Sequence, residues 1–406
     1  VEDLIAGTSV APADRLWAGQ VNIWFGSELA GGSRPPAAPA DVTIIGGAAG
    51  EALSASGMVR AVDVNGDGIK DLLIGAQFGK GPSGAGITRA GNVYIVFGRR
   101  HPQIFPSVID LERLNNGSTI TDGADVLIHG GTRNASNSNG GTGLWMETGD
   151  LNDDGVEDII VTTSGFFYGR ANIVFGRKTP SLFPRVIDLQ TLNSPTVKSG
   201  ADVWLSTSSY SDGGISLGSP KAIKTGDIDG DGITDLLLGD PAGQGPDNTK
   251  PGRGMFYVIR GRTGFPSRIN LAKQNGPGVT DGADCTIYGA ETEDAHSNHV
   301  VMWFGMDLTD INGDNRADIL LGFPLADGPD ETRQAAGEVA VIYGRGVLPP
   351  LVDLAGGVAA DVLIQGPAAS RYIGSYFQIA AGDINGDGLK DLFVGDSRSD
   401  GPGGSR

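Results

Sequence analysis

Carboxylate side chains recur at one fixed spacing in five places along the chain. The five segments begin at Asp63, Asp150, Asp227, Asp310 and Asp383, and each has oxygen-bearing side chains at positions 1, 3, 5 and 9. A hard cation such as calcium takes six to eight oxygen ligands. Alternate residues of a tight turn point inward, and the backbone carbonyl at position 7 adds a further oxygen. The spacing therefore predicts five calcium-binding loops.

The predicted ligands are the side chains at positions 1, 3, 5 and 9 and the carbonyl at position 7. They are Asp63, Asn65, Asp67, Ile69 and Asp71; Asp150, Asn152, Asp154, Val156 and Asp158; Asp227, Asp229, Asp231, Ile233 and Asp235; Asp310, Asn312, Asp314, Arg316 and Asp318; Asp383, Asn385, Asp387, Leu389 and Asp391. Three Asp in each loop, plus Asp229, make sixteen. Packing so many carboxylates into turns is unfavourable without a cation.

Two other interpretations of such a loop are weaker. An EF-hand begins in the same way but requires a bidentate Glu at position 12, followed by a helix. Position 12 is apolar here and leads into a β-type run: Ile74, Val161, Leu238, Leu321 and Val394. An ordinary Asp/Asn/Gly turn would explain a single copy, but not five copies in one context. Position 6 needs a positive φ, which suits glycine, and Asn315 is the one replacement.

Composition limits the classes of partner. The formal net charge is -18, which disfavours nucleic acid and anionic membranes because both need a basic surface. Five Ca²⁺, ten positive charges, would change this to -8. Cys285 is the only cysteine, so an internal disulfide and a zinc–thiolate cluster are excluded. The sequence has no apolar run of about 18 residues that could span a membrane.

The acidic loops belong to a larger repeat, because their starts are 87, 77, 83 and 73 residues apart. Each loop is followed by an apolar run, a glycine-rich stretch, a segment like GNVYIVFGR, a linker like FPSVIDL and a closing ADVLIHG-type segment. The apolar runs are short and rich in β-branched and aromatic residues, which predicts strands. Val93 to Phe97 and Leu236 to Leu238 are apolar on both faces. Such strands need cover from both sides, as in stacked sheets.

Four strands per repeat predict an all-β fold, a β-propeller of four-stranded blades with calcium-binding hairpin loops. A β-helix needs a shorter repeat, and an immunoglobulin-like array needs about 100 residues per unit. The predicted units of one propeller domain or fragment over 1–406 are 1–46, 57–130, 144–206, 221–289, 303–366 and 376–406. Twenty-one predicted strands allow a closed five-bladed ring. A start without Met and an end inside a glycine-rich stretch favour a longer ring that is truncated within a repeat at both ends.

These segments resemble the FG-GAP repeat, the blade unit of integrin α-chain propellers and of many bacterial surface proteins. The calcium loop carries most of the resemblance. The Phe-Gly before it survives at Phe304-Gly305, and the Gly-Ala-Pro after it is degenerate, as in Gly75-Ala76-Gln77. The FPSVIDL-type linkers look closer to bacterial multi-repeat exoproteins. The resemblance implies a propeller that usually has seven blades, so a truncated seven-bladed ring is the expected fold. It also implies a secreted or cell-surface scaffold for adhesion or recognition of a protein or glycan ligand, with calcium as cofactor.

No catalytic residues are predicted, because no GxSxG, P-loop or HExxH motif occurs. The histidines are His101, His129, His296 and His299, and the last two are expected in a solvated loop. The resemblance leaves one alternative open. The chain could be an accessory propeller of a secreted enzyme, similar to glycosylphosphatidylinositol phospholipase D or to polysaccharide lyases.

The tryptophans are the candidates for stacking on a sugar ligand, and packing between blades is the favoured prediction for each. They are Trp17, Trp24, Trp145, Trp204 and Trp303. Ligand contacts are expected in the variable loops.

Overall fold

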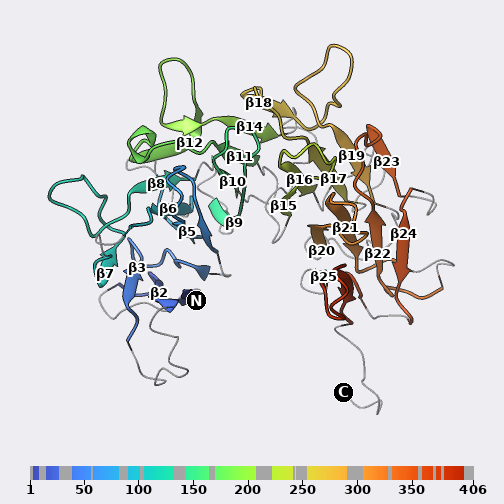
Figure 1. The fold of residues 1–406 in the computed structure, drawn as a ribbon, viewed down its shortest axis with the longest axis horizontal. Helices are drawn as coiled ribbons and strands as arrows, with labels where there is room; N and C mark the ends of the chain where they lie inside the picture. The colour runs from blue at the N-terminus through green and yellow to red at the C-terminus, as the bar shows by residue number, and fades with distance from the viewer. Residues whose placement is uncertain are drawn as a thin grey trace. The chain divides into compact units, whose positions relative to one another are not determined.

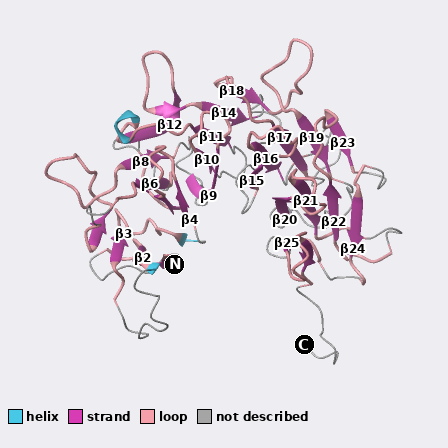
Figure 2. Ribbon diagram, viewed as in Figure 1, coloured by secondary structure: helices cyan, strands magenta, loops and turns pink. Residues whose placement is uncertain are grey.

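The computed structural model describes residues 3–8, 15–26, 39–55, 58–81, 90–100, 105–130, 142–163, 170–206, 222–240, 243, 254–289, 305–327, 332–354, 359–368, 372–375 and 379–396. The regular structure of these residues is almost entirely strand (Figures 1 and 2). A single turn of 3-10 helix, η2, covers Pro180–Leu182. The all-β prediction is therefore confirmed.

The chain divides into two compact units. The first comprises Val1–Thr148, Gly155–Phe166 and Arg170–Trp204, and the second comprises Gly149–Asp154, Phe167–Gly169 and Leu205–Arg406. The predicted single domain and its repeat boundaries stay predictions.

The first unit contains three sheets. The first sheet has the order β1 (Leu4–Thr8), β2 (Gln20–Trp24), β3 (Val42–Ile45), β7 (Val108–Asp110). The second has the order β4 (Val59–Val62), β5 (Asp71–Ala76), β6 (Asn92–Val96), β8 (Val126–His129), β12 (Val186–Leu192), β13 (Gly200–Ala201). The third includes β9 (Thr142–Gly149), β10 (Asp158–Thr163), β11 (Arg170–Val174) and β14 (Val203–Ser206).

The second unit also contains three sheets, besides β18 (Arg268–Asn270). The largest has the order β15 (Ile223–Gly226), β16 (Asp235–Asp240), β17 (Met255–Ile259), β19 (Cys285–Tyr288), β23 (Leu351–Asp353). The next has the order β20 (Gly305–Thr309), β21 (Asp318–Phe323), β22 (Glu338–Ile342), β24 (Val362–Gln365). The last is the hairpin of β25 (Ile379–Gly382) and β26 (Asp391–Val394).

The predicted set of four strands per repeat is present as an antiparallel sheet. In the second unit, β20 pairs with β21, β21 with β22 and β22 with β24, all antiparallel. The same pattern joins β4, β5, β6 and β8 in the first unit. The first two strands of each set form the hairpin that carries an acidic loop.

The linkers form a fifth strand that the sequence analysis did not predict. Strand β7 pairs in parallel with β3, β12 with β8, and β23 with β19. In each case a linker strand extends the sheet built by the preceding repeat, and β13 pairs in turn with β12. The central residue of each three-residue paired segment, Ile109, Ile187 or Val352, is buried. Consecutive repeats are therefore joined by backbone hydrogen bonds as well as by the chain.

Sheets stack face to face through residues that alternate along each strand. In the first unit, Leu72 and Ile74 of β5 lie in one apolar cluster with Ile44 of β3. Their neighbour Leu73 lies in a second cluster with Ile159 of β10. The second sheet is thus covered on both faces, as the doubly apolar strands predicted.

The same arrangement holds in the second unit. Leu321 of β21 packs in a cluster with Phe256 of β17, whereas Leu320 packs with Ile379 of β25. Small antiparallel sheets stacked in this way are what the propeller prediction requires. The number of blades stays a prediction.

Replacing Ile187 with Ala tests whether the linker strand stabilises the fold. We expect a loss of about 2–5 kcal/mol in the free energy of unfolding, measured by urea titration, because Ile187 is fully buried. The matched control is Val186→Ala on the same strand, where the side chain is 38% exposed, and a change within about 0.5 kcal/mol is expected. Equal effects of the two substitutions would contradict the parallel pairing.

Candidate metal-binding loops

Each predicted loop connects two antiparallel strands of one hairpin. The hairpins are β4–β5, β9–β10, β15–β16, β20–β21 and β25–β26. All of the predicted ligand residues lie in the described part of the chain. The loops are therefore β-hairpin turns, and the EF-hand interpretation is excluded because a strand, not a helix, follows each of them.

The carboxylate at position 1 organises the turn. In the first loop, Oδ1 of Asp63 accepts a hydrogen bond from the Gly66 amide at 2.7 Å, and Oδ2 accepts one from the Gly68 amide at 2.7 Å. The corresponding pairs in the third loop measure 2.6 and 2.9 Å around Asp227. The backbone thus wraps around one carboxylate, as in an Asx turn.

Positions 3 and 5 also fold their oxygens over the turn. The Asp67 amide donates to Oδ1 of Asn65 at 3.0 Å, and the Ile69 amide donates to Oδ1 of Asp67 at 2.8 Å. The fourth loop repeats both bonds at 2.9 Å, from the amides of Asp314 and Arg316. Side chains at positions 1, 3 and 5 therefore converge on the same turn, as alternate residues were predicted to do.

Position 6 adopts the left-handed conformation in every loop. The φ angles are 78° at Gly68, 82° at Gly155, 88° at Gly232, 65° at Asn315 and 89° at Gly388. Glycine and asparagine tolerate this region with little strain. The prediction for position 6 is confirmed.

Position 9 has a structural role that sequence reasoning missed. Oδ2 of the fully buried Asp318 accepts the Ile311 amide at 2.9 Å, and its Oδ1 accepts the Gly344 amide at 2.8 Å. Ile311 belongs to the same loop, whereas Gly344 follows the third strand of the sheet. This carboxylate therefore fastens the loop to the sheet, in addition to its predicted role as a ligand.

The same bonds recur in three other loops. Position 9 accepts the glycine amide of the Phe-Gly-Arg-type segment at 2.8–2.9 Å, in the pairs Asp71–Gly98, Asp158–Gly176 and Asp235–Gly261. Burial raises the pKa of Asp71 and of Asp235 to about 7, and the neighbouring loop carboxylates add to the rise. A nearby cation would lower these pKa values and favour the charged form.

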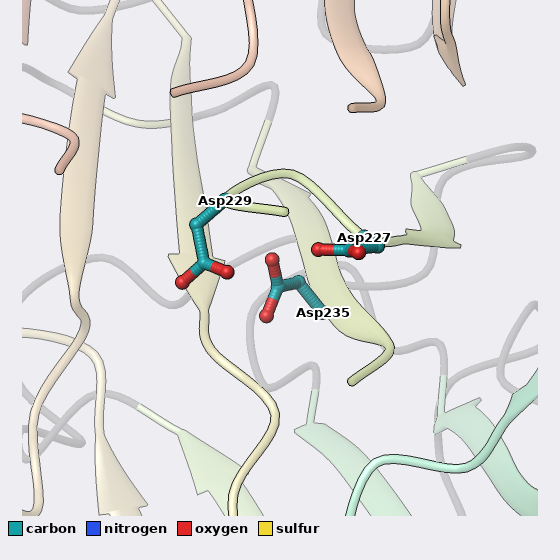
Figure 3. Close-up of side chains that lie close together, drawn as sticks. All are labelled: Asp227, Asp229 and Asp235. Atoms are coloured by element: carbon teal, nitrogen blue, oxygen red, sulfur yellow. The ribbon is translucent and has the colours of Figure 1, made fainter. Parts of the chain in front are cut away.

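One loop brings three carboxylates together. Oxygens of Asp227, Asp229 and Asp235 lie within 4.8 Å of one another, the one such acidic group of three or more among the described residues (Figure 3). The other loops have Asn at position 3, so they have one acid fewer. The donors in every loop are carboxylate, amide and backbone oxygens, a set that fits a hard divalent cation and not a soft one.

Neighbouring loops contact each other. The Ala317 amide of the fourth loop donates to the Asp227 carbonyl of the third at 2.6 Å, and the Thr234 amide donates to the Asp150 carbonyl at 3.3 Å. The position-7 side chain of one loop lies against the position-4 glycine of the previous loop, as Arg316 does at Gly230 and Leu389 at Gly313. Ordering one loop therefore helps to position the next sheet.

Among the candidate histidines, the structure describes His129, which lies on β8 and not in an acidic loop. His129 shares a 3.0 Å hydrogen bond with Asn92, and burial lowers its pKa. His101, His296, His299, Trp303 and Phe304 lie outside the described residues.

The tryptophans divide into two groups. Trp24, Trp145 and Trp204 are half-buried, and the Arg170 guanidinium stacks on the Trp204 ring at 3.9 Å. Trp17 is 59% exposed, so the prediction that it packs between sheets is wrong. Its backbone is left-handed, with φ 62°, in the turn before β2, and this turn directs the ring into solvent.

Comparison with known families and proteins identifies the repeat. The FG-GAP repeat model matches residues 59–96 and 302–342, which contain the first and fourth acidic loops with their flanking strands. The chain therefore contains FG-GAP repeats, as the resemblance indicated.

Two curated relatives match parts of the chain. Integrin alpha-PS2 of Drosophila melanogaster is 31% identical over 183 residues, 44% of this chain and 11% of the relative. Phosphatidylinositol-glycan-specific phospholipase D of Dictyostelium discoideum is 27% identical over 193 residues, 46% of this chain and 18% of the relative. The chain thus spans less than a fifth of the length of either relative.

Two solved structures are similar in part. Rhamnogalacturonan lyase PL11 of Bacillus licheniformis has 14% identity and a TM-score of 0.35, over 62% of this chain and 39% of the lyase. Rhamnogalacturonan lyase YesW has 12% identity and a TM-score of 0.36, over 96% of this chain and 57% of that lyase.

Among the described residues, no helix has the length and apolar character needed to cross a membrane.

A pair of glycine substitutions in one loop tests the contact between loops. Gly230 and Gly232 have similar φ angles of 79° and 88°, so Ala is strained to a similar extent at both. A Cβ at Gly230 would lie 2.5 Å from Nε of Arg316, whereas one at Gly232 would meet nothing within 4 Å. We expect Gly230→Ala to lower the free energy of unfolding by about 1 kcal/mol more than Gly232→Ala. Equal losses in urea titrations would contradict the close packing of Arg316 against Gly230.

Proposed function

We propose that this chain is an extracellular, calcium-binding FG-GAP propeller that serves as a scaffold for adhesion or recognition. The observation that carries the proposal is the recurrence of one oxygen-rich turn in five hairpins, in each of which the amide at position 5 donates to the side-chain oxygen at position 3. A calcium ion in each loop would supply the positive charge that the clustered carboxylates lack. The proposed ligands are the twenty-five residues predicted from the spacing.

The amide bonds inside the loops are compatible with an ion. A carboxylate has about four lone-pair positions. The shortest hydrogen bonds that Asp63 accepts come from the amides of Gly66 and Gly68, one to each oxygen. These bonds hold the oxygens in place before an ion arrives, which reduces the entropy lost on binding. The loops therefore orient their ligands, and the ion offsets their mutual repulsion.

The proposed setting is outside the cell, on the surface or secreted. Affinities of about 10⁻⁴–10⁻³ M are typical of extracellular calcium modules and would suffice for a structural site. The partial match to integrin alpha-PS2 supports this setting. The net charge of -18 favours a protein or glycan partner over nucleic acid.

The scaffold is proposed to be non-catalytic. The match to a phosphatidylinositol-glycan-specific phospholipase D favours the alternative that it accompanies a secreted enzyme. In that case the matched segment would still act as a repeat scaffold.

Calcium should stabilise the fold, as measured by thermal unfolding in chelator and at about 1 mM calcium. By linkage, a loop with a dissociation constant of about 10⁻⁴ M contributes about 1.4 kcal/mol under these conditions. Magnesium at the same concentration should stabilise less, because it dehydrates reluctantly and demands octahedral geometry. Unfolding curves that calcium leaves unchanged would refute the proposal.

Adjacent carboxylates in the second loop provide the matched variants for this experiment. Asp154 is a predicted ligand at position 5, whereas Asp153 at position 4 is not. Asp154→Ala should lower the number of bound calcium ions by one in isothermal titration, and Asp153→Ala should leave it unchanged.

Incubation with polymeric uronates tests the enzyme alternative. A non-catalytic scaffold should produce no unsaturated uronate product over hours, with or without calcium. Product formation that persists after repurification, and that rises in proportion to protein concentration, would replace the scaffold proposal with a lyase.

A further inference from the structure

The third acidic loop differs from the other four at two places that touch each other. Position 3 is Asp229, where the other loops have Asn65, Asn152, Asn312 and Asn385. The residue before the glycine of the Phe-Gly-Arg-type segment is Arg260, where the other complete repeats have Phe97, Phe175 and Tyr343. Both changes occur in the same repeat, and the two side chains form an ion pair.

The ion pair is built into the loop. The Asp229 side chain is 2% exposed, and both Nε and an Nη of Arg260 contact its Oδ2. The same guanidinium donates to the Gly346 carbonyl at 3.2 Å, which fixes its orientation. The Arg260 amide still donates to Asp284 at 2.8 Å, as the Phe97 amide donates to Asp125. The backbone role of the repeat is thus unchanged, and only the side chain differs.

The Asn-to-Asp change removes a hydrogen bond inside the loop. In the first loop, Nδ2 of Asn65 donates to Oδ1 of Asp71 at 3.2 Å, so position 3 supports position 9 directly. An Asp at position 3 cannot donate in this way, and Asp229 instead lies beside the carboxylates of Asp227 and Asp235 (Figure 3). Two buried carboxylates so close together need a cation. Arg260 provides one from within the chain.

A second arginine reaches the same loop. Nε of Arg316 donates to the Asp229 carbonyl at 3.1 Å, and its aliphatic part lies against Gly230. Arg316 occupies position 7 of the fourth loop, where the other loops have Ile69, Val156, Ile233 and Leu389. The most acidic loop is therefore the one flanked by two guanidinium groups.

We propose that Arg260 is the internal counter-ion of the third loop. It holds the loop in its folded conformation without a divalent ion, and it makes this loop the weakest of the five calcium sites. An Asp–Arg pair carries the same net charge as an Asn beside an aromatic residue, but its guanidinium contacts an oxygen of a predicted calcium ligand. A calcium ion must therefore displace the guanidinium from Asp229 or bind close to its positive charge. The part of the inference about calcium rests on the proposed function above.

A double-mutant cycle in chelator tests the counter-ion without any metal. Arg260→Phe leaves the buried Asp229 unpaired, so we expect its unfolding temperature to fall below that of the wild type. Arg260→Phe combined with Asp229→Asn recreates the arrangement of the first loop and should recover most of the loss. Tyr343→Phe, at the same place in the fourth repeat, is the control and should have no effect. If Arg260→Phe unfolds like the wild type in chelator, the counter-ion proposal is overturned.

Calcium titration of the same proteins tests the affinity. Arg260→Phe frees an extra carboxylate for the ion, so one site should bind calcium about tenfold more tightly or better. Calcium should also restore the unfolding temperature that this variant loses in chelator. Unchanged affinities at all sites would overturn the claim that Arg260 weakens the third site.

Transfer of the pair to the fourth loop provides an independent check. Asn312→Asp with Tyr343→Arg should weaken a second calcium site, and an unweakened site would contradict the inference. Absence of calcium binding by every protein, wild type included, would refute the proposed function together with the affinity claim. The chelator cycle would still decide whether Arg260 stabilises the loop.

Discussion

The buried carboxylate at position 9 is the interaction on which the rest of the repeat depends. Asp71, Asp158, Asp235 and Asp318 are all fully buried, and each accepts an amide from the glycine that follows the third strand of its sheet. A buried carboxylate is costly unless its oxygens are satisfied. The loop, the first hairpin and the third strand must therefore form together, and this requirement couples the acidic turn to the sheet.

The coupling explains why a glycine follows the third strand. A Cβ on Gly98 would lie 2.5 Å from the Lys70 carbonyl, and one on Gly261 would lie 2.4 Å from the Thr234 carbonyl. Both carbonyls belong to position 8 of a loop. The backbone at the glycine therefore lies directly against the backbone of the loop, at the place where the position-9 carboxylate accepts the glycine amide. The recurring Phe-Gly-Arg-type segment is thus a consequence of the acidic loop rather than a separate motif.

Sequence reasoning predicted the features that depend on local spacing. Positions 1, 3 and 5 of each loop, the positive φ at position 6 and the hairpin topology all follow from side chains within a few residues. Asn315, which stands at position 6 of the fourth loop in place of glycine, keeps the same φ region. The two-sided burial of strands such as Leu236–Leu238 followed from their composition. These features depend on residues close together in the sequence, and the loop ligands and the strand side chains both alternate with a period of two residues.

Features that depend on distant partners could not be predicted in this way. The linker strand β12 pairs with β8, about sixty residues earlier in the sequence, by the register Val186↔Leu127. Only three residues of β12 make this pairing, and so short a segment does not identify its partner. The amide partner of Asp318 lies 26 residues away. The recurrence of the FPSVIDL-type linkers was the available signal, because a linker without a pairing role has no reason to keep one alternating pattern.

Departures from the repeat are informative because the other copies act as controls within one chain. Asn315 replaces glycine without changing the turn, so it is a tolerated variation. The change at Asp229 is of another kind, because this buried carboxylate would lack a cationic partner without Arg260. A change that makes sense only with its partner indicates that the third loop satisfies its charge by a different route. The repeated fold can therefore keep one turn geometry while position 3 of the loop and the residue before the strand-following glycine change together.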